Sequence, residues 1–84
     1  MRVVVTIARK PGLSDPEGVA TSRALRDLGY SVGDVHFGRT ITLDVDTDDA
    51  EQARRDVTEM CERLLANPVI EDYEIALAPD RNPA

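Results

Sequence analysis

The stretch LLANPVIEDY, residues 64–73, decides the fold because it joins a helix pattern to a strand pattern through a corner. Pro68 disfavours helical backbone geometry at Asn67, and an asparagine can adopt the left-handed conformation that ends many helices. Every second residue from Val69 to Leu77 falls on one face, and most of these residues are apolar. The stretch therefore predicts a helix that ends at Asn67 and a last strand over residues 69–77.

The helix before this corner has the clearest pattern in the sequence. Asp48 and Glu51 have the spacing of a capping box at its start. Its apolar residues then recur at helical spacing and form one stripe, which we expect to be buried against a sheet. The stripe consists of Ala50, Ala53, Val57, Met60, Cys61 and Leu64.

The first part of the chain predicts a strand followed by a second amphipathic helix. Residues 2–8, RVVVTIA, carry no charge on either face after Arg2, which favours a central strand. Asp15 is a good N-cap, Pro16 suits the first helical position, and Gly29 is the expected left-handed stop. We expect this helix to bury Ala20, Ala24, Leu25 and Leu28, and to leave Val19 on the opposite side.

Residues 32–47 alternate in polarity on both sides of Gly38-Arg39, which predicts two strands in an antiparallel hairpin. The resulting order, βαββαβ, is the split βαβ or ferredoxin-like arrangement. This is an α+β fold in which both helices cover one face of an antiparallel sheet. We expect a dimer through the other sheet face, which would carry Val4, Thr6, Thr42, Asp44, Asp34 and His36. Residues 1–78 are expected to form one domain, and residues 79–84 a flexible tail.

The composition of the chain limits which classes of function are possible. The 84 residues carry a net charge of −6, which repels phosphate backbones, so we expect no nucleic-acid partner. Cys61 is the only cysteine, so an internal disulfide or a multi-cysteine zinc site is impossible, and a reducing cytoplasm is expected. The apolar run near the start is too short to cross a bilayer, so we expect no membrane association.

Candidate catalytic residues have simpler structural roles. Cys61 lies in the apolar stripe of a helix without a basic partner one turn away, which favours an inert, buried thiol. His36 and Asp34 could form an acid–base pair, but no nucleophile is identifiable near them. The acidic run from Asp44 to Asp49 lacks the glycine and the final glutamate of a calcium loop. The sequence therefore predicts no catalytic residue and no metal site.

Four segments, in this order, carry a resemblance to a known family: DPEG (15–18), ALRDLGY (24–30), VHFGRTITL (35–43) and MCERLLANPVIEDYEI (60–75). Over about residues 2–77 the chain resembles the PurS family, the small subunit of phosphoribosylformylglycinamidine synthase. Two residues depart from the expected pattern. Arg39 stands where a lysine is expected, and Val19 stands where a polar residue is expected.

The resemblance implies a non-catalytic bridging subunit of an ATP- and glutamine-dependent ligase in de novo purine biosynthesis. It would join a glutaminase subunit, PurQ, to a synthetase subunit, PurL, and would support ammonia transfer between them. ATP and magnesium would be used by the synthetase, and this chain would bind no cofactor. The resemblance also implies a homodimer or higher oligomer in the cytoplasm.

We expect the partner-binding residues to lie at the first helix start, at the hairpin and at the corner. They are Asp15, Pro16, Gly18, Val19, Arg39, Asn67, Pro68, Glu71, Asp72 and Tyr73. A second function class fits the same residues. This alternative is a stand-alone, small-molecule-sensing βαββαβ dimer that is similar to ACT-type domains in topology.

Overall fold

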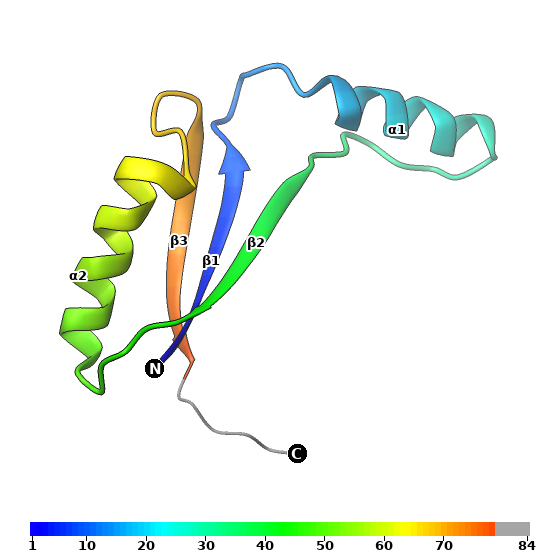
Figure 1. The fold of residues 1–84 in the computed structure, drawn as a ribbon. Coiled ribbons are helices and arrows are strands. Elements are labelled where there is room, and N and C mark those ends of the chain that lie inside the picture. Colours follow the sequence, from blue (N-terminus) through cyan, green and yellow to red (C-terminus); the bar gives the residue numbers. More distant parts are fainter. Residues whose placement is uncertain (79–84) are drawn as a thin grey trace, which may run out of the picture.

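The computed structural model describes residues 1–78 and centres on a three-stranded antiparallel sheet (Figure 1). The central strand, β1 (Arg2–Arg9), lies between β2 (Gly38–Asp44) and β3 (Glu71–Ala78). The predicted α+β class, with an antiparallel sheet and two helices, is confirmed. The predicted tail, residues 79–84, lies outside the described residues.

One face of the sheet is the core. Val3, Val5 and Ile7 of β1 are fully buried, and β2 and β3 add half-buried residues such as Ile41 and Ile75, both opposite Val5. Helix α2 (Ala50–Met60) and the π-helical turn η1 (Cys61–Leu65) cover this face. Their buried residues are Ala53, Val57 and Cys61, which confirms the centre of the predicted stripe.

The ends of this helix differ from the prediction. Asp49, not Asp48, is the N-cap, and its carboxylate accepts hydrogen bonds from the N–H groups of Glu51 and Gln52. At the other end, Ala66 takes an extended conformation, and no residue other than glycine has a positive φ among residues 1–78. The predicted left-handed Asn67 is therefore wrong. Its side chain instead accepts from the Val69 N–H, so the chain turns without strain and β3 begins at Glu71.

The predicted fold class holds, but helix α1 (Pro16–Asp27) does not cover the sheet in this chain, so the two helices do not share one sheet face as expected. We call residues 10–37 the arm. In the arm, α1 runs away from the end of β1, and residues 31–37 return along it without pairing as a strand (Figure 1). The predicted hairpin is absent because Gly38 and Arg39 begin β2 directly. The radius of gyration is 16.4 Å, compared with about 12 Å for a compact chain of this length.

The displaced arm changes which residues are buried. Ala20, Ala24 and Leu28 are exposed, contrary to prediction, and Leu25 is half-buried, because α1 packs on its own return segment through Gly18 and Ser22. On α2, the sheet covers only part of the predicted stripe, so Ala50, Met60 and Leu64 are exposed. Val19 is exposed, as predicted.

The uncovered sheet face carries Val4, Thr6, Thr42 and Asp44, as predicted from the pairing of β1 with β2. Asp34 and His36 were also expected there, but both lie in the return segment of the arm. Pairing of two copies through this face stays a prediction. Among residues 1–78, no helix has the length and apolar character needed to span a bilayer.

Candidate partner-binding site

An open cleft of about 390 Å³ lies at the end of the sheet where the arm departs. We call it the arm-base cleft. It is lined by the start of α1, the end of β1, and the starts of β2 and β3. Its polar lining residues are Arg9, Asp15, Glu17, Arg39 and Glu71, and its apolar lining includes Pro16 and Phe37.

Asp15 holds helix α1 and the return segment of the arm together at this cleft. As the N-cap of α1, its carboxylate accepts from the Gly18 N–H at 3.0 Å, and its other oxygen accepts from the Phe37 N–H at 2.8 Å. These two backbone hydrogen bonds lower the pKa of Asp15, with further help from the positive charge of Arg9. Gly18 is required here, because a Cβ atom would lie 1.9 Å from the Val35 carbonyl oxygen.

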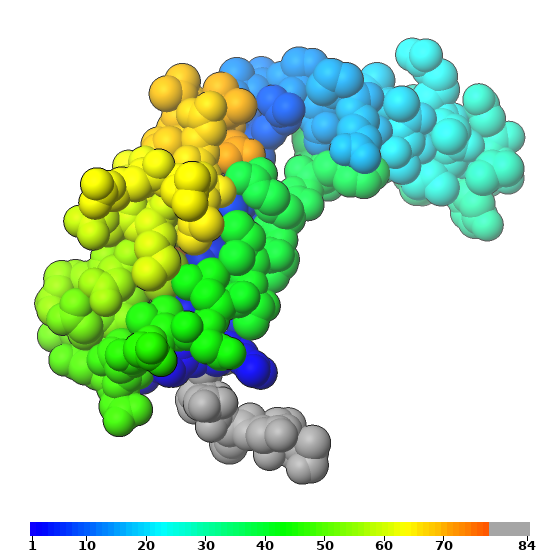
Figure 2. All heavy atoms as spheres, in the orientation of Figure 1, coloured from blue at the N-terminus to red at the C-terminus, as the bar shows by residue number. Residues whose placement is uncertain are grey.

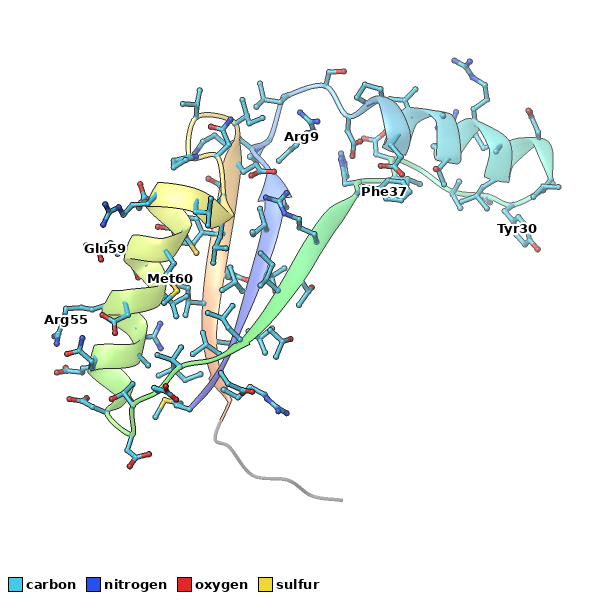
Figure 3. All side chains as sticks on the ribbon, viewed as in Figure 1. Arg9, Tyr30, Phe37, Arg55, Glu59 and Met60 are labelled. Carbon is cyan, nitrogen blue, oxygen red and sulfur yellow. The ribbon has the colours of Figure 1, made fainter. Side chains whose placement is uncertain are left out.

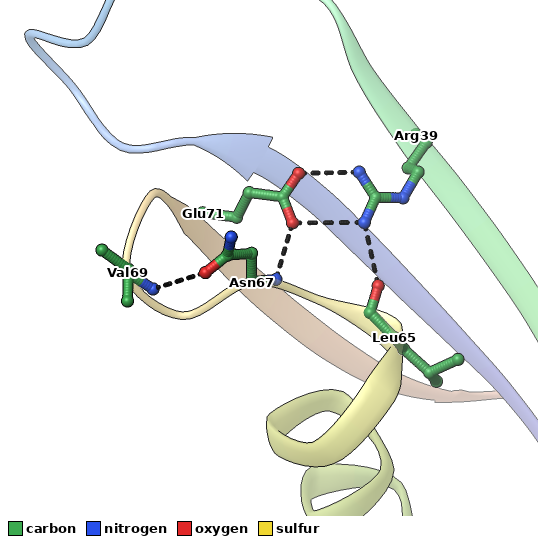
Figure 4. A network of polar contacts seen from close by, with 5 residues as sticks. All are labelled: Arg39, Leu65, Asn67, Val69 and Glu71. Carbon is green, nitrogen blue, oxygen red and sulfur yellow. Dashed lines mark hydrogen bonds and ion pairs between the residues drawn. The ribbon is translucent and has the colours of Figure 1, made fainter.

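Arg39 and Glu71 fix the corner to the sheet (Figure 4). The guanidinium donates to both oxygens of Glu71, at 2.7 and 3.2 Å, and to the Leu65 carbonyl oxygen at 2.8 Å. Glu71 also accepts from the Asn67 N–H at 2.8 Å. This network raises the pKa of Arg39 and lowers the pKa of Glu71. A lysine could not form the paired contact, because it has no planar fork of donors.

Two further contacts order the corner from its other side. Lys10 Nζ lies 2.7 Å from the Asp72 carboxylate, an exposed pair that links the arm to β3. Tyr73 donates its hydroxyl proton to Glu62 at 2.5 Å, which raises the pKa of the phenol to about 12. Between these contacts, Pro68 and Val69 form an exposed tip, and 80% of the Val69 surface is accessible.

Comparison with known proteins decides the family. The model of the PurS family, phosphoribosylformylglycinamidine (FGAM) synthase, matches residues 2–79. The chain belongs to the PurS family.

Individual relatives agree with this assignment. Phosphoribosylformylglycinamidine synthase subunit PurS of Methanothermobacter thermautotrophicus is 44% identical over 75 residues, covering 89% of each chain. The crystal structure of PurS from Methanocaldococcus jannaschii matches with a TM-score of 0.81 at 41% identity, covering 89% of this chain and 92% of that one. A chain of the PurLQS structure from Thermotoga maritima matches with a TM-score of 0.83 at 33% identity, covering 89% and 93%.

The structure brings four of the ten expected partner-binding residues together at the arm-base cleft: Asp15, Pro16, Arg39 and Glu71. Asn67 contributes its N–H to the same network, and Pro68 lies in the adjoining tip. Asp72 and Tyr73 have separate partners on β3. Gly18 is buried inside the arm, and Val19 lines a second hollow, between α1 and residues 34–36.

Sequence reasoning missed Arg9 and Phe37, which also line the cleft. Arg9 had a recognisable signal, because it is the first charged residue after the apolar run of β1 and therefore marks the end of that strand. Phe37 lies in the segment that was predicted to form a hairpin, but it precedes β2 and 40% of its surface is accessible.

The chemistry of the cleft suits recognition by another protein. Two arginines and three carboxylates line its open mouth, and the rims of protein–protein interfaces are polar in the same way. Elsewhere, burial raises the pKa of the Cys61 thiol, so it is protonated and unreactive at neutral pH. Residues 1–78 contain no group of three or more side chains positioned to hold a metal ion.

Proposed function

We propose that this chain is the non-catalytic bridging subunit of phosphoribosylformylglycinamidine synthase in de novo purine biosynthesis. It joins a glutaminase subunit, PurQ, to an ATP-dependent synthetase subunit, PurL. The observation that carries this proposal is the likeness to a chain of the PurLQS structure, with a TM-score of 0.83 over 89% of this chain. The same likeness favours the synthase over a stand-alone sensor domain.

The physical role of a bridging subunit is to hold the glutaminase and synthetase active sites in a fixed relative position. Ammonia released into bulk water is diluted and protonated, so the glutaminase and synthetase sites must be joined by an enclosed path. A bridging subunit supplies fixed surfaces that seal and orient such a path. A standard interface takes about 800 Å² from each partner, and the 6211 Å² surface of this chain has room for a self-contact and two partner contacts.

The contact surface that we propose is the arm-base cleft together with the adjoining corner. Asp15, Pro16, Arg39, Asn67, Pro68, Glu71, Asp72 and Tyr73 belong to it or fix its shape. Gly18 supports it from inside the arm, and Val19 offers an exposed apolar contact at the second hollow, between α1 and residues 34–36. In this proposal ATP and magnesium act on the synthetase, this chain binds no cofactor, and the complex works in the cytoplasm as an assembly that contains two or more copies of this chain.

Reconstitution with the cognate glutaminase and synthetase tests this function. We expect one complex that contains all three chains, measured by intact-complex mass and by sedimentation. Arg9→Glu changes the charge of the cleft without removing any of the hydrogen bonds described above, and we expect it to weaken assembly at least about tenfold. Arg55→Glu, on the outer side of α2 in Figure 3, is the matched control and should assemble normally.

Failure of the unmodified chain to bind either subunit would contradict the function. Equal assembly of Arg9→Glu and the unmodified chain would contradict only the location of the contact surface.

A further inference from the structure

The last turn of the second helix contains one residue more than a regular α-helix would. After α2 ends at Met60, the Ala66 N–H donates at 3.1 Å to the carbonyl oxygen of Cys61, five residues back instead of four. This bond closes the π-helical turn η1 (Cys61–Leu65). A π turn amounts to one inserted residue, and such insertions occur frequently at functional sites. The insertion lies directly before the corner, which belongs to the proposed contact surface.

The insertion changes which leucine faces the core. The fully buried residues of α2 and η1 are Ala53, Val57 and Cys61. With 3.6 residues per turn, a regular α-helix would place Leu64 about 20° from their mean direction and Leu65 about 80° from it. The structure has the opposite order, because Leu65 packs against the core and 82% of the Leu64 surface is accessible. The π turn therefore explains why the prediction of a buried Leu64 is wrong.

Side chains from two strands hold η1 and the corner in this position. Arg39 of β2 donates to the Leu65 carbonyl oxygen at 2.8 Å, which is one of the acceptors that a helix end leaves without a partner in the helix. Glu71 of β3 accepts from the Asn67 N–H at 2.8 Å and also binds Arg39. The inserted residue is therefore fixed by the sheet and belongs to the folded structure.

The charged groups around the corner are already paired or hydrogen-bonded within the chain. Three contacts do this: Arg39 with Glu71, Lys10 with Asp72, and Tyr73 with Glu62. An ion that has a partner costs less to bring into an interface than an ion that has none. The charges that surround the corner therefore do not prevent another protein from covering it.

The side chains that this arrangement leaves at the surface are apolar. Leu64 projects from η1, and 80% of the Val69 surface is accessible in the turn that follows. Figure 4 shows Val69 pointing away from the network of Arg39 and Glu71. In Figure 2 the atoms of η1 and the corner, drawn in yellow and light orange, lie at the outer surface without the arm over them. Apolar side chains inside a rim of polar contacts are typical of the centre of a protein–protein interface.

We propose that the inserted residue of η1 gives the corner an apolar contact for a partner subunit. Leu64 and Val69 enter an apolar pocket on the glutaminase or the synthetase, and the arm-base cleft supplies the charged part of the contact surface. This contact rests on the proposed function and adds Leu64 and Val69 to its residues. A regular α turn would direct Leu64 toward the sheet, so the insertion is what makes this leucine available to the partner.

Leu64→Ser tests the apolar side chain in the reconstituted complex. It keeps the π turn, and because Leu64 is exposed it should leave the melting temperature within about 3 °C of that of the unmodified chain. We expect it to raise the dissociation constant of this chain from the glutaminase and synthetase at least about tenfold. Arg55→Ser, on the outer side of α2 in Figure 3, is the matched control and should leave this constant unchanged.

Deletion of Arg63 tests the inserted residue itself. Arg63 is exposed and takes part in none of the hydrogen bonds described above, and its removal makes the Ala66–Cys61 bond a regular α-helical one. Leu65 then lies three residues from Cys61 and stays over the sheet, whereas Leu64 moves to another side of the helix. We expect a melting temperature at least as high as that of the unmodified chain, with assembly weakened at least about tenfold.

A photoreactive amino acid in place of Val69 identifies what covers the corner. It should crosslink to the glutaminase or the synthetase in the assembled complex. Crosslinking to a second copy of this chain, assembly at unmodified strength by Leu64→Ser or by the deletion, or a deletion that melts at least about 10 °C lower would each overturn the apolar contact. If the unmodified chain fails to assemble, the proposed function itself is contradicted, so the two failures are distinguishable.

Discussion

Asp15 connects two parts of the arm that are 22 residues apart through one carboxylate. The sequence showed its role as N-cap, because aspartate before proline is typical of a helix start. Its second bond, to the Phe37 N–H, had no sequence signal, because it depends on where the return segment lies. The hydrogen bond at the helix start was therefore predictable from the sequence, and the hydrogen bond to the return segment was not.

Asp15→Asn should reduce stability at neutral pH, because the amide nitrogen cannot accept from a backbone N–H. The folded-state pKa of Asp15 lies below its unfolded value of 3.8, so its contribution is complete above that value. The contribution is lost as the pH falls through the folded pKa. Melting temperatures followed by circular dichroism from pH 7 to pH 3 should show the two proteins converging in acid. A difference in melting temperature that grows as the pH falls would contradict the role of the Asp15 carboxylate as acceptor of both hydrogen bonds.

Arg39 occupies the position where the family resemblance suggests lysine, and the structure gives the arginine a specific geometry. It contacts two oxygens of Glu71 and one backbone carbonyl, from a side chain that is half exposed. Arg39→Lys should cost up to about 1 kcal/mol in the free energy of unfolding, because it keeps the charge but loses the paired contact and exposed pairs contribute little. Urea denaturation measures this cost. A variant as stable as the unmodified chain would show that the network only orients the corner.

At the scale of elements, α2 was predicted well and α1 was not. Both helices show apolar residues at helical spacing, and both precede a strand that pairs with β1, but only α2 lies over the core. Periodicity indicates that a face is buried, but it does not say in which copy or against which element. The apolar stripe of α1 stays exposed in this chain, so periodicity alone did not place the helix.

Substituting single side chains of α2 and η1 with alanine should distinguish the residues that the sheet covers from those that it leaves exposed. Val57→Ala removes fully buried methyl groups above the sheet and should cost about 2 kcal/mol in the free energy of unfolding. Leu64 lies on the same predicted stripe, but 82% of its surface is accessible. We therefore expect Leu64→Ala to cost less than about 0.5 kcal/mol in the free energy of unfolding of a single chain.

The comparison must therefore be made at protein concentrations below dimer formation, with chemical denaturation as the measurement. If Leu64→Ala costs as much as Val57→Ala under these conditions, α2 and η1 pack on the sheet through a different face from the one seen in the structure.

At the scale of the whole molecule, the sequence pattern correctly predicted that β1 is a central strand of an antiparallel sheet, but it overestimated how far one chain closes on itself. The hairpin at Gly38 was a reasonable inference from alternation and a glycine. It fails because Gly18 and Asp15 hold residues 35–37 against α1, and neither contact is visible in a local pattern. The result is a chain with an arm, suited to contacts between subunits.

This shape matches the function that family membership implies. A subunit that carries no catalytic chemistry contributes through the surfaces that it presents and through the distance that it fixes between its partners. The arm-base cleft and the exposed corner are two such surfaces on one chain of 84 residues.

The most direct test compares two nitrogen sources in the reconstituted synthase. With glutamine, amidine formation by the glutaminase and synthetase should depend on added chain and rise at least about tenfold at saturation. With a saturating ammonium salt, the synthetase should work at nearly the same rate whether or not the chain is present. Glutamine-dependent synthesis that proceeds equally well without the chain would contradict the account.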